Sequence, residues 1–399
     1  MLSQLPDAPA GDPETVGRAE ALRPELEALS GEMERNRRLS PALLDKLHEA
    51  RLFRMLLPRS VNGLETDPLT FMQVIESVAR SDASTAWCLS QAGGCATAAA
   101  YLDPAVATRI FGNDSRAVLA WAPGPAKAFE VEGGYRISGA WTFASGARHA
   151  TWVGAHAPIF RPDGTPVLGP DGVQIERTML VPAGEVTMVD IWDTIGLRAT
   201  ASDQFTLNDH FVRADHSITR NFARDWECRE PGPLYRVSAL VFYEMGFASV
   251  ALGIARASLD VFVDLARHKM QRGIKTPLRD NAAVQTNLAQ AEVGLRSARS
   301  YLRQCVSDMW RHVCQPDGKL TVEQRILIRM ASTHAIHQAR NAVDFAYNAA
   351  GTATVFASHP LERRFRDMHT VTQHLQGRLP HFETVGAWMM GAPADLTFV

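Results

Sequence analysis

The sequence lacks the short patterns that mark several large enzyme classes. It contains no Gly-x-Gly-x-x-Gly after a strand pattern, no Gly-x-x-x-x-Gly-Lys-Ser/Thr loop, no His-Glu-x-x-His pair and no Gly-x-Ser-x-Gly turn. Each of these patterns places groups around a phosphate, a metal ion or a nucleophilic serine. Their absence argues against a nicotinamide-binding domain, a P-loop nucleotidase, a zinc peptidase and a serine hydrolase.

The sequence also has little net charge, few cysteines and no signal-peptide pattern. The 399 residues carry a net charge of −2, so binding of nucleic acid has no electrostatic support. The five cysteines are odd in number and lack Cys-x-x-Cys spacing, which argues against disulfides and against a metal site. The start of the chain is polar and proline-rich, and no apolar run of membrane-spanning length stands out. We therefore expect a cytoplasmic protein without metal, nucleic-acid or membrane partners.

The patterns that are present predict an α+β chain in three parts. Residues 1–115 carry leucines at three- and four-residue spacing and a Ser40-Pro41 helix start, which is typical of a helical domain. Residues 116–226 alternate with period two between turn dipeptides, as in an antiparallel β-barrel or sandwich. Residues 227–399 return to long helical patterns with short turns, which predict a four-helix bundle.

Two stretches are candidates for chemistry. The segment 360–374 holds Arg366, Asp367, His369 and His374 within nine residues. Its proline at position 360 predicts a helix start, and we expect this helix to continue as far as residue 374.

The second stretch, Gly139–Gly146, is a strand pattern with an aromatic face that ends in small residues. Ser145-Gly146 would let a planar ligand approach backbone donors closely. A buried tryptophan followed by a turn is the simpler interpretation. Elsewhere, Trp87 and Trp121 are candidate walls of a substrate pocket, although large aromatic residues usually belong to a core.

With these stretches in their order, the chain resembles the acyl-CoA dehydrogenase fold. It resembles more narrowly the flavin-dependent monooxygenases of two-component systems, which hydroxylate phenols, indoles and dibenzothiophene. The strings that carry this resemblance are Gly133–Gly146, Gly196–Ser202, and Gly351-Thr352 followed by Pro360–His374. It extends over nearly the whole chain.

The resemblance implies a reduced flavin, FMN or FADH2, between the β domain and the C-terminal bundle. Ser145 would then lie near flavin N5. The resemblance implies cofactor contacts from the β strand and from the C-terminal part, at Trp141, Thr142, Phe143, Ala144, Ser145, Arg267, Gly351, Thr352 and His369. Of these, Gly351 and Thr352 would contact the flavin of a neighbouring subunit.

One departure from the dehydrogenases is informative. Those enzymes remove the α-proton of a thioester with a carboxylate, whereas the corresponding Thr372–Gly377 contains no acid. It contains His374, and an imidazole suits deprotonating a phenol or holding the proton of a hydroperoxide. We therefore predict His374 and Ser145 as catalytic residues of a monooxygenase that acts through a C4a-hydroperoxyflavin.

Two alternatives remain open: an FAD-dependent acyl-CoA dehydrogenase-type oxidoreductase with an atypical base, and a helical scaffold that has lost its cofactor. The monooxygenase hypothesis requires O2, an aromatic or heteroaromatic substrate and a separate NAD(P)H:flavin reductase. The chain's lack of a nicotinamide fingerprint agrees with a separate reductase. The resemblance also implies a homotetramer.

Overall fold

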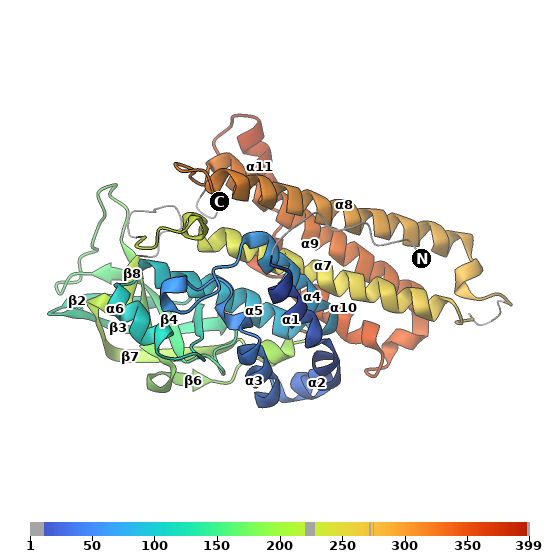
Figure 1. Cartoon of the computed structure of the whole chain (residues 1–399), viewed down its shortest axis with the longest axis horizontal. Helices are drawn as coiled ribbons and strands as arrows, with labels where there is room; N and C mark the ends of the chain where they lie inside the picture. Colours follow the sequence, from blue (N-terminus) through green and yellow to red (C-terminus); the bar gives the residue numbers. More distant parts are fainter. Residues whose placement is uncertain (1–11, 220–227, 271–272, 274, 397–399) are drawn as a thin grey trace.

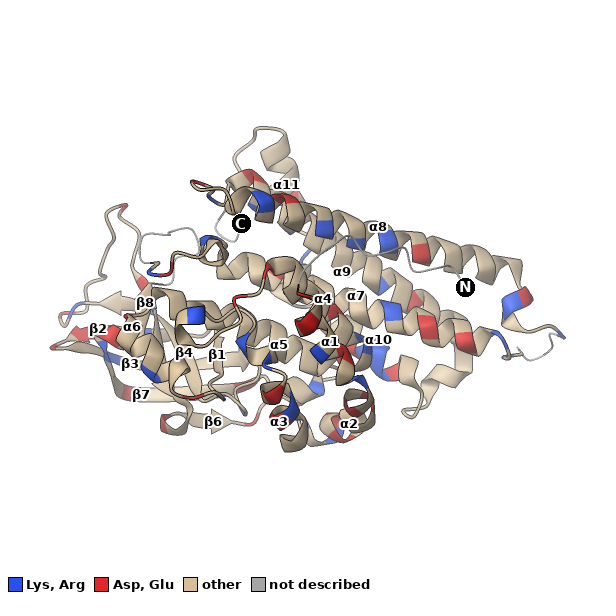
Figure 2. Ribbon diagram, in the orientation of Figure 1, with Lys and Arg blue, Asp and Glu red and all other residues tan. Residues whose placement is uncertain are grey.

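The computed structural model describes residues 12–219, 228–270, 273 and 275–396. In Figure 1 the strands gather at one end of the molecule and the long C-terminal helices extend to the other. Along the ribbon in Figure 2, residues of both charge signs are interspersed, which agrees with the net charge of −2. The predicted domain boundaries near residues 115 and 226 remain predictions, and the second lies outside the described residues.

Four helices in the first part start in the same way, with a capping side chain followed by proline. Asp12, Ser40, Asp67 and Asp103 each accept a hydrogen bond from a backbone N–H of the helix that follows. Asp82 caps α5 in the same way but without proline. The α-helices are α1 (Pro13–Ala21), α2 (Arg23–Asn36), α3 (Pro41–Glu49), α4 (Pro68–Ser81), α5 (Ala83–Ala96) and α6 (Pro104–Ala107).

Eight strands form one mixed sheet in the order β6-β7-β3-β2-β4-β5-β8, with β1 paired to β4. The expectation of a purely antiparallel domain is wrong, because β4 runs parallel to both β1 and β2. Alternation and turn dipeptides locate strands but not their partners, and the chain crosses from β3 to the far side of β2. The strands are β1 (Leu119–Ala122), β2 (Ala126–Val131), β3 (Gly134–Ala144), β4 (Trp152–Phe160), β5 (Glu176–Pro182), β6 (Thr187–Val189), β7 (Asp203–Arg213) and β8 (Ser217–Thr219).

The C-terminal part is a helical bundle, as predicted. Its helices are α7 (Ala239–Ala266), α8 (Ala282–Val313), α9 (Val322–Ala350), α10 (Pro360–Val371) and α11 (His381–Met389). Helix α10 begins at Pro360 as expected but ends at Val371. His374 therefore lies beyond the helix, where it caps the 3₁₀ turn η12 (Leu375–Gly377). The expectation that one helix would carry Arg366 through His374 is wrong.

Helix α7 joins the first and last parts of the chain into one core. Phe71 of α4 packs edge-on against Phe242 of α7, with 6.1 Å between ring centroids. Helix α7 is long and apolar enough to cross a membrane, so the expectation that no such run exists is wrong. However, 78% of its most apolar window is buried inside the protein. Its apolar character is that of a core helix, while the sheet keeps a separate core around Trp141 and Phe205.

Candidate active site

Ser145 stands directly after β3, where the strand pairing is irregular. The register between β3 and β7 shifts between Trp141 and Ala144, and Phe143 adopts a left-handed backbone with φ of 68°. A bulky residue in that region is strained, and β-bulges often re-aim side chains beside active sites. The irregularity leaves Phe143 62% exposed and Ser145 buried.

A chain of hydroxyl groups surrounds Ser145. Its Oγ accepts a hydrogen bond from Trp87 Nε1 at 3.0 Å and lies 2.7 Å from Ser202 Oγ. Ser202 Oγ lies 2.7 Å from Thr200 Oγ1, which donates to the carbonyl of Leu197 at 2.8 Å. Because the Thr200 proton is used, Ser202 donates to Thr200 and Ser145 donates to Ser202. Ser145 Oγ, which also accepts from Trp87, keeps one lone pair that can accept a hydrogen bond from a ligand.

The loop that carries these hydroxyls is anchored to α10. The Leu197 N–H donates to Asp367 Oδ1 at 2.6 Å. A Cβ at Gly196 would lie 2.3 Å from the carbonyl oxygen of Arg366, so only glycine permits this approach. Burial raises the pKa of Asp367 to about 7, while the charge of Arg363 acts in the opposite direction. Asp367 therefore ties the C-terminal helix to the hydroxyl chain at Ser145.

His374 approaches Trp87 from the other side. Its ring lies 5.0 Å from that of Trp87 and 4.5 Å from that of Phe247, in edge-on geometry. The Gln376 N–H donates to its Nδ1 at 3.4 Å, so in the neutral ring the proton resides on Nε2. Among the described residues none is hydrogen-bonded to Nε2. Although part of the ring surface reaches solvent, burial lowers the pKa of His374 to about 4, and Arg378 acts in the same direction.

These contacts bring the two predicted catalytic residues together around one tryptophan. Ser145 Oγ can accept a hydrogen bond and Nε2 of His374 can donate one, and both groups are neutral at neutral pH. A ring with a pKa near 4 is a weak base, so the geometry favours holding a proton on a developing oxygen group over deprotonating a phenol. Trp87 was expected only as a pocket wall, and its N–H to Ser145 was not foreseen.

The flavin contacts predicted on β3 divide into two kinds. Trp141 is wrong as a lining side chain, because its indole is fully buried, stacks on Phe205 at 5.0 Å and donates to the carbonyl of His156 at 2.9 Å. Ala144 is likewise fully buried, whereas Thr142 is partly exposed. The exposed aromatic of the segment is Phe143, whose ring meets Trp192 edge-on at 5.9 Å.

His369 and Trp121 have other neighbours than expected. His369 Nε2 lies 2.8 Å from Asp344 Oδ1 of α9, and its contact with a cofactor remains a prediction. Trp121 packs on His156 at 5.3 Å, and its carbonyl accepts from Gln91, one helical turn beyond Trp87 on α5. Among the described residues no hydrogen bond or ring contact joins Trp121 to His374, and the role of Trp121 as a pocket wall remains a prediction.

The remaining predicted cofactor residues gather at the far end of α7. Arg267 is exposed and lies 3.3 Å from Asp264. Lys269 donates to the carbonyl of Ala350, directly before Gly351 and Thr352. Arg267 follows Phe247 by 20 residues, which is about 30 Å of helix. Arg267, Gly351 and Thr352 therefore do not share a single small site with His374 of the same chain.

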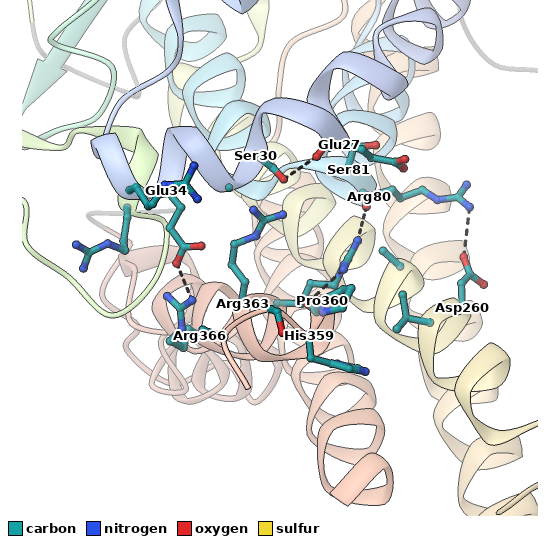
Figure 3. A pocket seen from close by; sticks show the side chains of 18 of the residues that line it. Glu27, Ser30, Glu34, Arg80, Ser81, Asp260, His359, Pro360, Arg363 and Arg366 are labelled. Atoms are coloured by element: carbon teal, nitrogen blue, oxygen red, sulfur yellow. Dashed lines mark hydrogen bonds and ion pairs between the residues drawn. The ribbon is translucent and has the colours of Figure 1, made fainter. Parts of the chain in front are cut away.

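A hollow of about 970 Å³ between α2, α4, α7 and the start of α10 is a separate feature (Figure 3). Seven arginines and three carboxylates line it, but neither Ser145, Trp87 nor His374 does. Arg366 pairs there with Glu34 of α2 at 2.6 Å. This ion pair helps to hold α10 against the N-terminal helices. The residues predicted to be catalytic lie outside the hollow, in the cluster around Trp87.

The sequence analysis missed four parts of the site: Thr200, Ser202, Phe247 and the hydrogen bond between Asp367 and Leu197. The first two lie in Gly196–Ser202, a string that pointed to the family, and their hydroxyl side chains were the available signal. Their contacts with Ser145 are made through space and leave no spacing pattern in the sequence.

Comparison with known proteins identifies the family. The N-terminal domain of acyl-CoA dehydrogenase matches residues 19–105, and the C-terminal domain matches residues 245–378. The indole-3-acetate monooxygenase of Pseudomonas putida is 30% identical over 362 residues, which is 90% of either chain. The chain belongs to the flavin-dependent monooxygenases of this fold. The predicted family and fold are confirmed, and the monooxygenase hypothesis is favoured over the dehydrogenase alternative.

Two further proteins resemble this monooxygenase over nearly its full length. The flavin-dependent monooxygenase oxygenase subunit HsaA of Rhodococcus jostii is 25% identical over 363 residues, covering 90% of this chain and 93% of that protein. The structure of XiaF from a Streptomyces species, in complex with FADH2 and glycerol, matches with a TM-score of 0.89 and 27% identity over 96% of both chains.

Proposed function

We propose that this monooxygenase is the oxygenase component of a two-component system. It receives FADH2 or reduced FMN from a separate NAD(P)H:flavin reductase and inserts one oxygen atom of O2 into an aromatic or heteroaromatic small molecule. The observation that carries the proposal is the convergence of Ser145 and His374 on Trp87. The names of two relatives, an oxygenase subunit and an indole-3-acetate monooxygenase, support the reductase and the aromatic substrate.

The residues around Ser145 fit a flavin ring. Phe143 offers an exposed aromatic face beside the Ser145 oxygen, which can accept a hydrogen bond, and His374 offers a donor. A planar heterocycle with donor and acceptor atoms at its edge needs this combination of stacking and directed hydrogen bonds. Reduced flavin, when bound, supplies the electrons that convert O2 into the inserted oxygen atom and water. Ser145 would then accept a hydrogen bond from the ligand, and His374 would hold a proton at the oxygen side of that reaction.

The aromatic substrate is supported by a stack of rings next to His374. Trp87 and Phe247 stack with 4.0 Å between centroids and 22° between planes. Tyr243 continues the stack on Phe247 at 5.7 Å and 8°. All three rings are buried, so a flat apolar substrate would meet the edge of this stack beside the imidazole.

Arg267, Gly351 and Thr352 are proposed to serve the flavin of a neighbouring subunit, because about 30 Å of helix separates them from the Ser145 site. Arg267 and Lys269 would then meet its phosphate. This arrangement requires the homotetramer expected from the resemblance, or at least a dimer. We also propose a cytoplasmic location, because the oxygenase would need a flavin reductase and NAD(P)H in the same compartment.

The test combines the purified protein, a flavin reductase, NADH, ¹⁸O2 and a panel of phenols and indoles. Mass spectrometry should show a product that carries one ¹⁸O atom, formed only when the oxygenase is present. Ser258→Ala, which removes a buried serine hydroxyl bonded within α7, is the matched control for Ser145→Ala. Bleaching of bound oxidised FAD by an acyl thioester, without any labelled product, would instead establish the dehydrogenase.

A further inference from the structure

The turn that follows His374 is held by side chains at every carbonyl. Leu375 O accepts from His381 Nε2 at 2.6 Å, and Gly377 O accepts from His337 Nε2 at 2.9 Å. Gln376 O lies at the hydrogen-bond limit, 3.5 Å, from Thr333 Oγ1. Carbonyl oxygens only accept, so both histidines carry their proton on Nε2. The donors come from α9 and α11, which are otherwise remote from the Ser145 site.

One of these carbonyls belongs to the peptide unit that faces His374. The carbonyl of Leu375 and the N–H of Gln376 lie on one planar trans peptide and point in opposite directions. His381 holds the carbonyl side of this unit, and the N–H side donates to His374 Nδ1. Because the unit is rigid, fixing its carbonyl also fixes the donor that meets His374.

His381 is in turn held by a buried ion pair. Arg329 Nη1 lies 3.1 Å from Nδ1 and 3.0 Å from Nε2 of His381. Because the Nε2 proton is donated to Leu375 O, Nδ1 is the ring nitrogen that can accept from Arg329. Arg329 Nε donates to Glu244 Oε1 at 2.8 Å, and both side chains are only 1% exposed. Glu244 stands on α7, one turn before Phe247, whose ring packs on His374. A continuous row of hydrogen bonds thus runs from α7 through α9 and α11 to the His374 ring.

We infer that His381, backed by Arg329 and Glu244, is a positioning residue that sets the tautomer of His374 through the Leu375–Gln376 peptide. The row allows only Nε2–H on His374, because an Nδ1–H would face the Gln376 N–H. A proton on Nε2 is the one that reaches a ligand beside Trp87. The consequence for oxygen transfer rests on the proposed function, whereas the tautomer itself does not.

The direct test is ¹⁵N NMR of protein labelled on histidine, with the His374 signals assigned by their loss in His374→Gln. The wild type should show a neutral His374 with its proton on Nε2 at pH 7. His381→Phe should give a mixture of both tautomers, and His381→Gln, whose amide can still donate to Leu375 O, should restore Nε2–H. An Nδ1–H form in the wild type, or an unchanged tautomer in His381→Phe, overturns the inference.

A matched control separates this role from general support of the turn. His337→Phe removes a hydrogen bond to Gly377 O, on a peptide that does not face His374, and should leave the tautomer unchanged. In the coupled assay, His381→Phe should lower product per O2 consumed about ten-fold, whereas His337→Phe should not. A changed tautomer with unchanged product would keep the positioning role and remove His374 from the proposed reaction.

Discussion

The two halves of the site, around Ser145 and around His374, are built from different chemical groups. The Ser145 half consists of neutral hydroxyls whose protons point one way, from Ser145 through Ser202 and Thr200 to the Leu197 carbonyl. The His374 half rests on a buried ion pair and fixed imidazole protons. One half can therefore accept a hydrogen bond from a ligand, while the other can donate one. The predictions below test this contrast, beginning with the largest effect.

Arg329→Ala should cost the most stability, because it leaves the Glu244 carboxyl, whose pKa burial raises to about 7, without its Arg329 partner in the core. Breaking a buried ion pair in this way typically costs about 3–5 kcal/mol of unfolding free energy. Urea unfolding measures the loss. Replacing both partners by apolar residues, Arg329→Met with Glu244→Leu, should recover most of it. A loss below about 1 kcal/mol for Arg329→Ala would show that the His374 half does not depend on this pair.

Ser145→Ala should break the Ser145 half without unfolding it. Removing one preorganised hydrogen-bonding group lowers turnover by about 10²–10³-fold in comparable sites, and here hydrogen peroxide should replace product. Product and peroxide per NADH measure the effect. Ser258→Ala, the buried serine of α7, should leave both unchanged. Equal yields from Ser145→Ala and wild type would contradict a hydrogen-bonding role for this hydroxyl.

Asp367→Asn tests the anchor between α10 and the hydroxyl chain. Because burial raises its pKa to about 7, folded Asp367 keeps a proton between about pH 4 and 7 that the unfolded chain releases. This group therefore makes stability fall as pH rises through that window, by up to about 1.4 kcal/mol per pH unit. Asparagine still accepts from Leu197 N–H but cannot ionise. The difference in unfolding free energy, mutant minus wild type, should increase from pH 5 to 8, and a flat difference would contradict the raised pKa.

The sequence predicted helix starts better than the ends of elements. Pro360 fixes where α10 begins, because proline and its capping residue act locally. The end at Val371 depends on side chains of α9 and α11 that hold the next turn. In the same way the alternation around β3 predicted a strand, yet the irregular pairing buries Trp141 and exposes Phe143. Ser145 and His374 were recognisable by motif, but their meeting at Trp87 depends on the tertiary fold.

Phe143→Gly should give the smallest change, with opposite signs for stability and binding. A left-handed backbone costs a side-chain-bearing residue roughly 1–2 kcal/mol relative to glycine, so thermal stability should rise slightly. Reduced flavin should bind more weakly by about 1 kcal/mol, because a stacking face is lost. Calorimetry of both processes measures the two effects. Unchanged flavin affinity would place the ring elsewhere than on Phe143.

The most direct measurement is a crystal structure of the protein soaked anaerobically with reduced flavin. The account predicts the flavin ring beside Phe143, with N5 within hydrogen-bond distance of Ser145 Oγ and His374 Nε2 facing the same space. A flavin ring bound in the arginine-lined hollow between α2 and α10, or at any place that leaves Ser145 and His374 without contact to the ligand, would contradict it.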